Sequence, residues 1–199
     1  KTLSYEMLTS SPYYSQLLFL GEYLGFPGVS AFGGNYKDQV KPYVSQSCNI
    51  RTLYDKDLED HWSKYDLIKI LNEDTPHLIN HDGHAYYGYN LRMVNDDVDD
   101  LENELPFFVY SHGCMAGGFD NPDGYDCIAE HFTVETPNGA FAVIMNSRYG
   151  LGSEDSLDSP SQALDISFYK ALFDEQILQL GAASHFSKED NSWQINENG

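Results

Sequence analysis

The fold is indicated most clearly by two segments, Leu78-Ile79-Asn80-His81-Asp82-Gly83-His84-Ala85 and Phe107-Phe108-Val109-Tyr110-Ser111-His112-Gly113-Cys114-Met115-Ala116-Gly117-Gly118. Each is a short apolar run that enters a glycine-containing turn, and each turn carries an imidazole or a thiol. Continuous apolar runs of this length are typical of strands covered on both faces. If the two strands are parallel neighbours, their turns meet at one edge of the sheet.

Further apolar runs surround these two segments. Together they predict strands at 17–22, 50–54, 77–80, 107–111 and 140–145, and amphipathic patterns predict helices at 37–43, 63–72, 127–134 and 160–186. Ser63 is the expected cap of the second helix. Alternating strands and helices are typical of parallel βαβ units. The predicted fold class is therefore α/β, a three-layer sandwich with a mainly parallel central sheet.

The composition limits the classes of partner. The chain has 199 residues, of which 41% are hydrophobic, a size and content that suit one domain with a proper core. Eleven basic against 31 acidic residues give a net charge of −20, which argues against nucleic acid and anionic membranes as partners. Such a charge favours cationic ligands, basic peptides among them, although it is equally expected of an adaptation for solubility.

The ends and the cysteines carry further expectations. The chain opens at Lys1 without a methionine, and we expect residues 1–199 to be one catalytic domain or subdomain excised from a longer precursor. No apolar run approaches the ~20 residues of a membrane-spanning helix. Cys48, Cys114 and Cys127 make an odd number, so at least one thiol is free unless it pairs between chains. Cys48 and Cys127 could pair, but we expect free thiols.

The two turns could supply the chemistry of acyl transfer. A cysteine thiolate attacks a carbonyl carbon, and a neighbouring imidazole protonates the leaving amine. A cationic histidine beside Cys114 would also favour its thiolate form. The alternatives are a buried structural cysteine, and a His-Asp-Gly-His turn that is an ordinary loop or half of a metal site.

The order of these features resembles the gingipain-like cysteine peptidases of the caspase-like clan. A strand enters Gly83-His84, and some thirty residues later a second strand ends in Cys114, followed by Met115-Ala116-Gly117-Gly118-Phe119-Asp120. The resemblance continues through three later segments and covers about residues 17–187. These segments are Asp126-Cys127-Ile128-Ala129-Glu130-His131-Phe132, Gly139-Ala140-Phe141-Ala142-Val143-Ile144-Met145 with Asn146-Ser147-Arg148, and Phe168-Tyr169-Lys170-Ala171-Leu172-Phe173.

The resemblance implies a caspase–haemoglobinase-like fold and endopeptidase activity. It places the nucleophile on Cys114, the acid/base on His84 and the oxyanion donors on the backbone amides of Cys114 and Ala85. Family members usually have glycine after the histidine, and Ala85 departs from that pattern. An acidic residue that orients the imidazole corresponds to Glu22. His81 and His112 are rival bases, but His81 lacks the Gly-His order and His112 lies only two residues before Cys114 on the same strand.

Specificity and metal binding also follow from the resemblance. Gingipain-like enzymes cleave after Arg or Lys by means of an acidic residue, and by order this residue is Asp38, with Glu154 and Asp155 as the other candidates. No cofactor is expected for the chemistry. Calcium is common in this family, and a structural Ca²⁺ ion could bind Asp97, Asp99 and Asp100, although this acidic run lacks the spacing of an EF-hand loop and could equally be a solvated loop.

The predicted function is a secreted or cell-surface cysteine endopeptidase, made as a zymogen, that cleaves protein or peptide substrates after basic residues. Its expected partners include a pro-segment or further domains of its precursor. One alternative is an inactive caspase-like scaffold or binding domain stabilised by calcium, which the change to Ala85 supports. A receiver-like module is a third hypothesis, but it needs an aspartate where the first strand ends in Glu22.

Overall fold

The computed structural model describes residues 2–7 and 12–193. At its centre is a five-stranded parallel sheet with strand order β2-β1-β3-β6-β7. The strands are β1 (Gln16–Gly21), β2 (Asn49–Tyr54), β3 (Leu78–Asp82), β6 (Phe107–Ser111) and β7 (Ala140–Met145). A two-stranded antiparallel hairpin, β4 (Tyr89–Asn90) and β5 (Met93–Val94), follows β3. The predicted α/β class with a parallel sheet is confirmed.

Helices connect the strands. The α-helices are α1 (Thr2–Glu6), α2 (Gly33–Val40), α3 (Lys64–Glu73), α4 (Asn95–Asp99), α5 (Ile128–Glu130), α6 (Pro160–Phe173) and α7 (Leu180–Asp190). Short 3-10 turns lie at η1 (Pro12–Ser15), η2 (Gly28–Ala31), η3 (Lys41–Tyr43) and η4 (Asp55–Asp57), and a π-helical segment, η5 (His131–Glu135), continues α5. Within the described ranges, no helix has both the length and the apolar character that crossing a bilayer requires.

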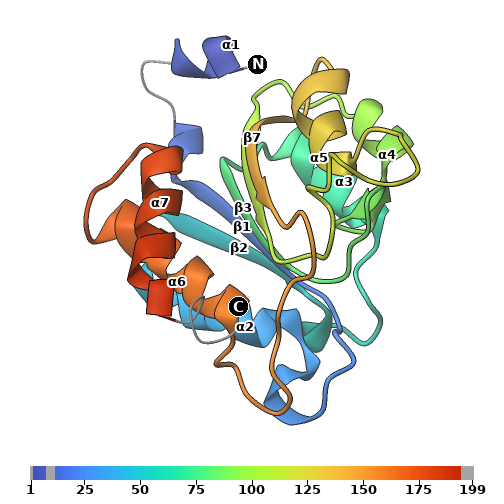
Figure 1. The fold of residues 1–199 in the computed structure, drawn as a ribbon. Helices are drawn as coiled ribbons and strands as arrows, with labels where there is room; N and C mark the ends of the chain where they lie inside the picture. The colour runs from blue at the N-terminus through green and yellow to red at the C-terminus, as the bar shows by residue number, and fades with distance from the viewer. Residues whose placement is uncertain (1, 8–11, 194–199) are drawn as a thin grey trace.

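The sheet separates two apolar cores. Alternate residues of β1 point to opposite sides: Leu18 and Leu20 pack with α3 and α5, whereas Leu17 and Phe19 pack with α2 and α6. Figure 1 shows the same division, with α2, α6 and α7 on one face of the sheet and α3, α4 and α5 on the other. The three predicted layers are therefore present, and both faces of the strands are covered.

Several predicted elements have the expected bounds. The strands at 107–111 and 140–145 are observed unchanged. The predicted cap of α3 is present as a reciprocal pair, because the Ser63 hydroxyl accepts from the Asp66 amide while the Asp66 carboxylate accepts from the Ser63 amide.

Two helix predictions are wrong in their bounds. The helix expected over 160–186 is two helices, because the chain turns at Gln176 with a φ of +57°, and the amides of Glu175 and Ile177 bond back to the carbonyls of Lys170 and Ala171. This turn lets α7 pack on α6.

The helix expected over 37–43 begins at Gly33. A Cβ on Gly33 would lie 2.2 Å from the Asp82 carbonyl, so glycine allows α2 to start directly against the sheet. Lys37 lies in the second turn of α2 and is fully buried in the core.

Candidate active site

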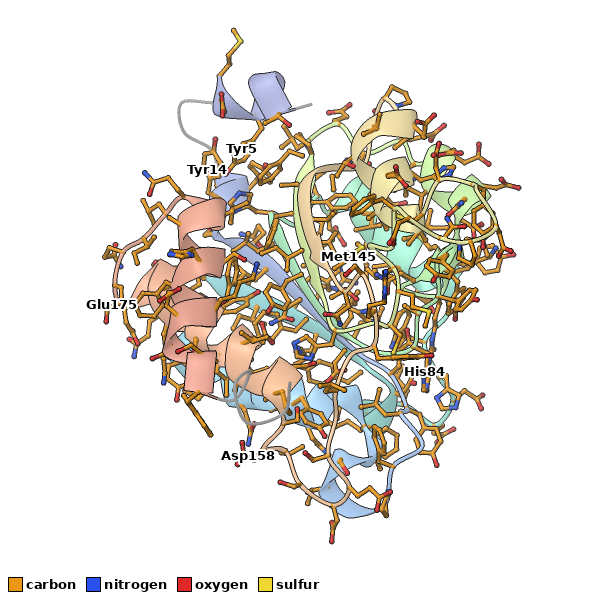
Figure 2. All side chains as sticks on the ribbon, in the orientation of Figure 1. Tyr5, Tyr14, His84, Met145, Asp158 and Glu175 are labelled. Carbon is orange, nitrogen blue, oxygen red and sulfur yellow. The ribbon has the colours of Figure 1, made fainter. Side chains whose placement is uncertain are left out.

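The candidate site lies where the strands of the parallel sheet end. Strands β3 and β6 are hydrogen-bonded neighbours, with His81 opposite Ser111, so the turns that follow them leave the sheet side by side. In Figure 2, His84 lies near this carboxyl edge, far from Tyr5 and Tyr14 at the opposite end of the molecule. A Cβ on Gly113 would lie only 2.4 Å from the Ala85 Cβ, so the two turns touch. The expected meeting of the two turns is observed.

Cys114 and His84 line one cleft of about 100 Å³. Its other lining residues come from the loops after β1, β6 and β7, from α2, from the end of β3 and the turn that follows it, and from the start of α6: Leu24, Phe26, Tyr36, Asp82, Gly83, His112, Gly150, Leu151, Gly152, Ser159 and Ser161. The Cys114 side chain is partly exposed, and His84 is exposed. Both groups are therefore accessible to a molecule that enters the cleft.

The loop after β7 holds the Cys114 turn. Its backbone carbonyls at Asn146 and Arg148 accept the amides of Gly117 and Met115, at 2.9 and 2.6 Å. The Gly150 amide donates to the Cys114 Sγ at 3.4 Å. The loop after β7 therefore holds both the backbone of this turn and the Cys114 sulfur itself.

The two predicted oxyanion donors remain available. Among the described residues, neither the Cys114 amide nor the Ala85 amide has a hydrogen-bond partner in the protein. Ala85 is absent from the residues with positive φ, so its backbone tolerates a Cβ. Replacement of the usual glycine by alanine thus leaves the amide in place.

Glu22 does not contact His84. Its carboxylate oxygen Oε1 lies 3.0 Å from the Nε2 of His81, and Oε2 lies 3.7 Å from the Nε of Arg92. The register explains this pairing, since Leu20 is opposite His81 and Glu22 follows two residues later on the same face. His84 lies beyond the strand end and has no hydrogen-bond partner among the described residues. The expected orienting contact is therefore replaced by a contact to the buried His81.

A buried ionic cluster lies below the cleft. The Lys37 ammonium donates to Asp165 at 2.7 Å and to Asn80 at 3.0 Å, and all three side chains are fully buried. Burial opposes ionisation of Asp165, but the charges of Lys37 and His112 outweigh it and lower the pKa of Asp165 to about 2. Lys37 and Asp165 are thus an internal ion pair, which sequence reasoning did not identify.

His112 joins this cluster to the cleft. Its Nε2 is 3.5 Å from Asp165 and 3.4 Å from the Lys37 Nζ, while its Nδ1 is 3.7 Å from Asp82. Burial and the Lys37 charge lower the pKa of His112, but the two carboxylates on either side raise it above its ordinary value overall. The ring lines the cleft yet is fixed between two acids.

The predicted specificity acids do not line the cleft. Asp38 forms ion pairs with Lys41, at 2.6 Å, and with Lys56. Asp155 accepts from the Val29 amide at 3.2 Å, and Glu154 is exposed. The acid that does line the cleft is Asp82, which sequence reasoning missed although it is the last residue of β3.

The acidic run predicted to hold calcium is paired internally. The Asp97 carboxylate binds the Lys64 ammonium at 2.8 and 3.0 Å and caps the Val94 amide, and Asp99 binds His131 at 2.8 Å. No group of three or more potential metal ligands converges in residues 2–7 and 12–193. Because the oxygens of Asp97 and Asp99 already bind protein partners, Asp97, Asp99 and Asp100 do not form a cage that fits Ca²⁺.

A second cysteine–histidine pair lines a larger apolar cavity of about 680 Å³ at the amino end of the sheet. There, the His77 ring is hydrogen-bonded at Nε2 to the Tyr5 hydroxyl, at 3.0 Å, and at Nδ1 to the Tyr14 carbonyl, at 3.2 Å. Burial lowers the pKa of His77 to about 4 and raises the pKa of the Cys48 thiol. Cys48 and His77 are therefore unsuited to acyl transfer. Cys48, Cys114 and Cys127 are all free thiols.

The chain is an α/β protein with a parallel sheet. In one cleft at the carboxyl edge of that sheet, it carries a cysteine and a histidine, the side chains of a cysteine hydrolase. The family model of peptidase family C25 matches residues 1–198, and the chain belongs to this family. A search of the curated proteins found no match.

Two solved structures are similar to this chain in fold. The crystal structure of the Arg-specific cysteine proteinase gingipain R superposes with a TM-score of 0.73 at 16% identity, covering 97% of this chain and 46% of that one. The complex of Porphyromonas gingivalis RgpB pro- and mature domains gives a TM-score of 0.66 at 16% identity, covering 96% and 48%. The chain therefore spans about half the length of these relatives.

Proposed function

We propose that this protein is a cysteine endopeptidase in which Cys114 is the nucleophile and His84 the acid/base. The observation that carries the proposal is the cleft itself, because both side chains line it and, among the described residues, the backbone amides of Cys114 and Ala85 have no hydrogen-bond partner. Membership of peptidase family C25 supports the same chemistry.

The reaction follows from these positions. The Cys114 thiolate adds to the carbonyl carbon of the scissile bond, and the carbonyl electron pair moves to oxygen, where the amides of Cys114 and Ala85 stabilise it. As the C–N bond breaks, the His84 imidazolium gives its proton to the leaving amine. The neutral imidazole then takes a proton from water, which adds to the thioester and releases the acid and the thiolate.

A preference for basic residues before the scissile bond forms part of the proposal. The Asp82 side chain is 11% exposed and lines the cleft, and its ion-pair partner His112 lies 3.7 Å away. Lys37 already pairs with Asp165, so Asp82 is the acid of this cluster that can receive a substrate cation. A guanidinium or ammonium would complete a charge-assisted pair.

The proposal also includes a location and a partner. We expect the protein to act outside the cell or on its surface, with a pro-segment as partner. The support is the likeness to a protein solved as a complex of pro- and mature domains.

The test uses a library of fluorogenic peptide amides that differ in the residue before the scissile bond. We expect cleavage after Arg or Lys, loss of at least 10³-fold in kcat with Cys114→Ala, and a comparable loss with His84→Ala. Cys48→Ala is the matched control, because its thiol is remote from the cleft. Cleavage that persists in Cys114→Ala would exclude this nucleophile, and absence of cleavage in the unaltered chain would favour the scaffold alternative.

Specificity is tested with Asp82→Asn against Asp38→Asn. Because charge-assisted hydrogen bonds contribute about 1.5–3 kcal/mol, Asp82→Asn should lower kcat/KM for Arg substrates by roughly 10- to 100-fold relative to an uncharged substrate. Asp38→Asn should leave this ratio unchanged. The opposite pattern would return the role to Asp38.

A further inference from the structure

The peptide unit that joins Gly113 to Cys114 is held by a side chain outside the catalytic pair. The Asn146 Nδ2 donates to the carbonyl of His112 at 2.9 Å and to that of Gly113 at 3.3 Å. Asn146 directly follows β7, so the edge strand of the sheet supplies this amide. Neither contact reaches the sulfur, and both contacts act on the backbone around it.

Planarity transfers the effect of Asn146 to the Cys114 amide. None of the described peptide bonds is cis, so the Gly113 carbonyl and the Cys114 N–H point in opposite directions from one rigid plane. Since the carbonyl faces Asn146, the N–H faces away from it, and this N–H has no partner among the described residues. The side chain of Asn146 therefore sets the direction of the predicted oxyanion donor.

The preceding peptide unit is fixed from the interior. The Gly113 amide donates to the Ser111 Oγ at 3.1 Å. That hydroxyl is itself held by the His81 Nδ1, at 2.9 Å, and by the Asn90 Oδ1, at 3.2 Å, and Glu22 holds the other side of the His81 ring. All four side chains are buried. The Ser111 hydroxyl thus has a fixed position from which to hold the Gly113 amide.

We propose that Asn146 and Ser111 are positioning residues that aim the Cys114 N–H at the developing oxyanion, an inference that rests on the proposed peptidase function. Together they fix two successive peptide planes at Gly113, a residue whose backbone would otherwise be unusually free to rotate. An oxyanion donor acts only within about 2.7–3.1 Å of the oxygen, and displacement by 1 Å can cost ~10²-fold in rate.

The expected changes in kinetics distinguish a positioning role for Asn146 and Ser111 from a general effect on folding. Loss of either side chain should lower kcat by about 10- to 100-fold with KM within about 2-fold, because the donor is needed mainly in the transition state. Binding of a peptide aldehyde should weaken in parallel, since its adduct with Cys114 carries the same oxygen. Alkylation of Cys114 by iodoacetamide should stay within about 2-fold, because this displacement forms no oxyanion.

The experiment compares Asn146→Ala and Ser111→Ala in the full chain with Asn138→Ala as the matched control. The Asn138 Nδ2 also donates to a backbone carbonyl, that of Leu101 at 2.6 Å, but at the amino end of β7. For each protein, kcat and KM for the peptide amide cleaved best in the library, the inhibition constant of the corresponding aldehyde, the alkylation rate and the thermal midpoint are measured. Asn138→Ala should lower the midpoint without changing the other four quantities.

The outcomes are distinct. A parallel fall of kcat and the alkylation rate would show that the substitutions disrupt the thiol or the fold, and would overturn the positioning role. Unchanged kcat in both Asn146→Ala and Ser111→Ala would overturn the positioning role as well. Because the two substitutions lie in different parts of the fold, the role can still be tested if one of the two variants does not fold. If the unaltered chain is alkylated at Cys114 but neither cleaves peptides nor binds the aldehyde, the proposed function itself fails and this inference fails with it.

Discussion

Replacement of Gly113 by alanine tests whether the two turns meet as the structure places them. The added Cβ would lie 2.4 Å from the Ala85 Cβ, 3.0 Å from the Asn90 Oδ1 and 3.2 Å from the Ser111 Oγ. Carbon atoms in contact are normally about 3.5–4.0 Å apart, so the turns must separate by roughly 1 Å. A Cβ cannot rotate away from such a contact, because the backbone fixes its position.

The magnitude follows from that displacement. Overpacking of this kind costs about 1–3 kcal/mol of stability. A shift of about 1 Å between nucleophile and acid/base can cost ~10²-fold in rate, equal to about 2.7 kcal/mol in the barrier. Gly113 is absent from the glycines with positive φ, so the loss would come from the collision and not from backbone strain.

The assay measures kcat/KM and the urea midpoint for the unaltered chain and three variants. Gly113→Ala should lose about 100-fold in kcat/KM, and the double variant Ala85→Gly/Gly113→Ala should recover most of it, because the closest contact is removed. Gly181→Ala is the control, since its Cβ would meet nothing within 4 Å in α7. Wild-type activity and stability in Gly113→Ala, or a double variant as impaired as the single one, would refute the placement of the two turns.

Two further predictions concern buried ionisable side chains. Lys37→Met should lower the free energy of unfolding by about 3–5 kcal/mol, because it leaves the buried Asp165 carboxylate without its ammonium partner. The double variant Lys37→Met/Asp165→Leu should be more stable than Lys37→Met alone. A loss below about 1 kcal/mol for Lys37→Met in urea unfolding would contradict the ion pair. His77 has a pKa of about 4 in the folded protein and about 6.5 in the unfolded chain, so the unfolded chain binds the proton more tightly. The contribution of His77 to the free energy of unfolding is therefore fully present above pH 6.5 and declines by about 3 kcal/mol as the pH falls to 4. His77→Gln should flatten this part of the stability curve, and an unchanged slope would refute the assignment.

Much of the fold could be predicted from local patterns. Strands covered on both faces appear in the sequence as continuous apolar runs, which is why 107–111 and 140–145 were predicted with their observed bounds. The cap at Ser63 is also local, since both partners of the capping pair lie within four residues. The break between α6 and α7 could not be predicted in this way, because the apolar spacing continues across Gln176 and the turn is stabilised by packing.

The candidate site also has features that local sequence predicts and features that depend on the tertiary structure. The glycine-containing turns with His84 and Cys114 could be identified in the sequence because each lies within a few residues of a strand end. The partners of Glu22 could not, because Glu22 and His81 come from different strands and meet only through the register of β1 and β3. Asp38 and Asp82 show the same limit: both are acids near a predicted element, and only the tertiary structure pairs one with lysines and turns the other toward the cleft.

The sequence by itself determined the alternation of strands and helices, the excess of negative charge and the chemical groups available at the strand ends, because these depend on neighbours along the chain. The tertiary structure alone decided which acid faces the cleft, which histidine Glu22 binds and which amides surround the sulfur. Those contacts join residues that are far apart in the sequence, and their distances are set by sheet register and by the close approach that glycine permits.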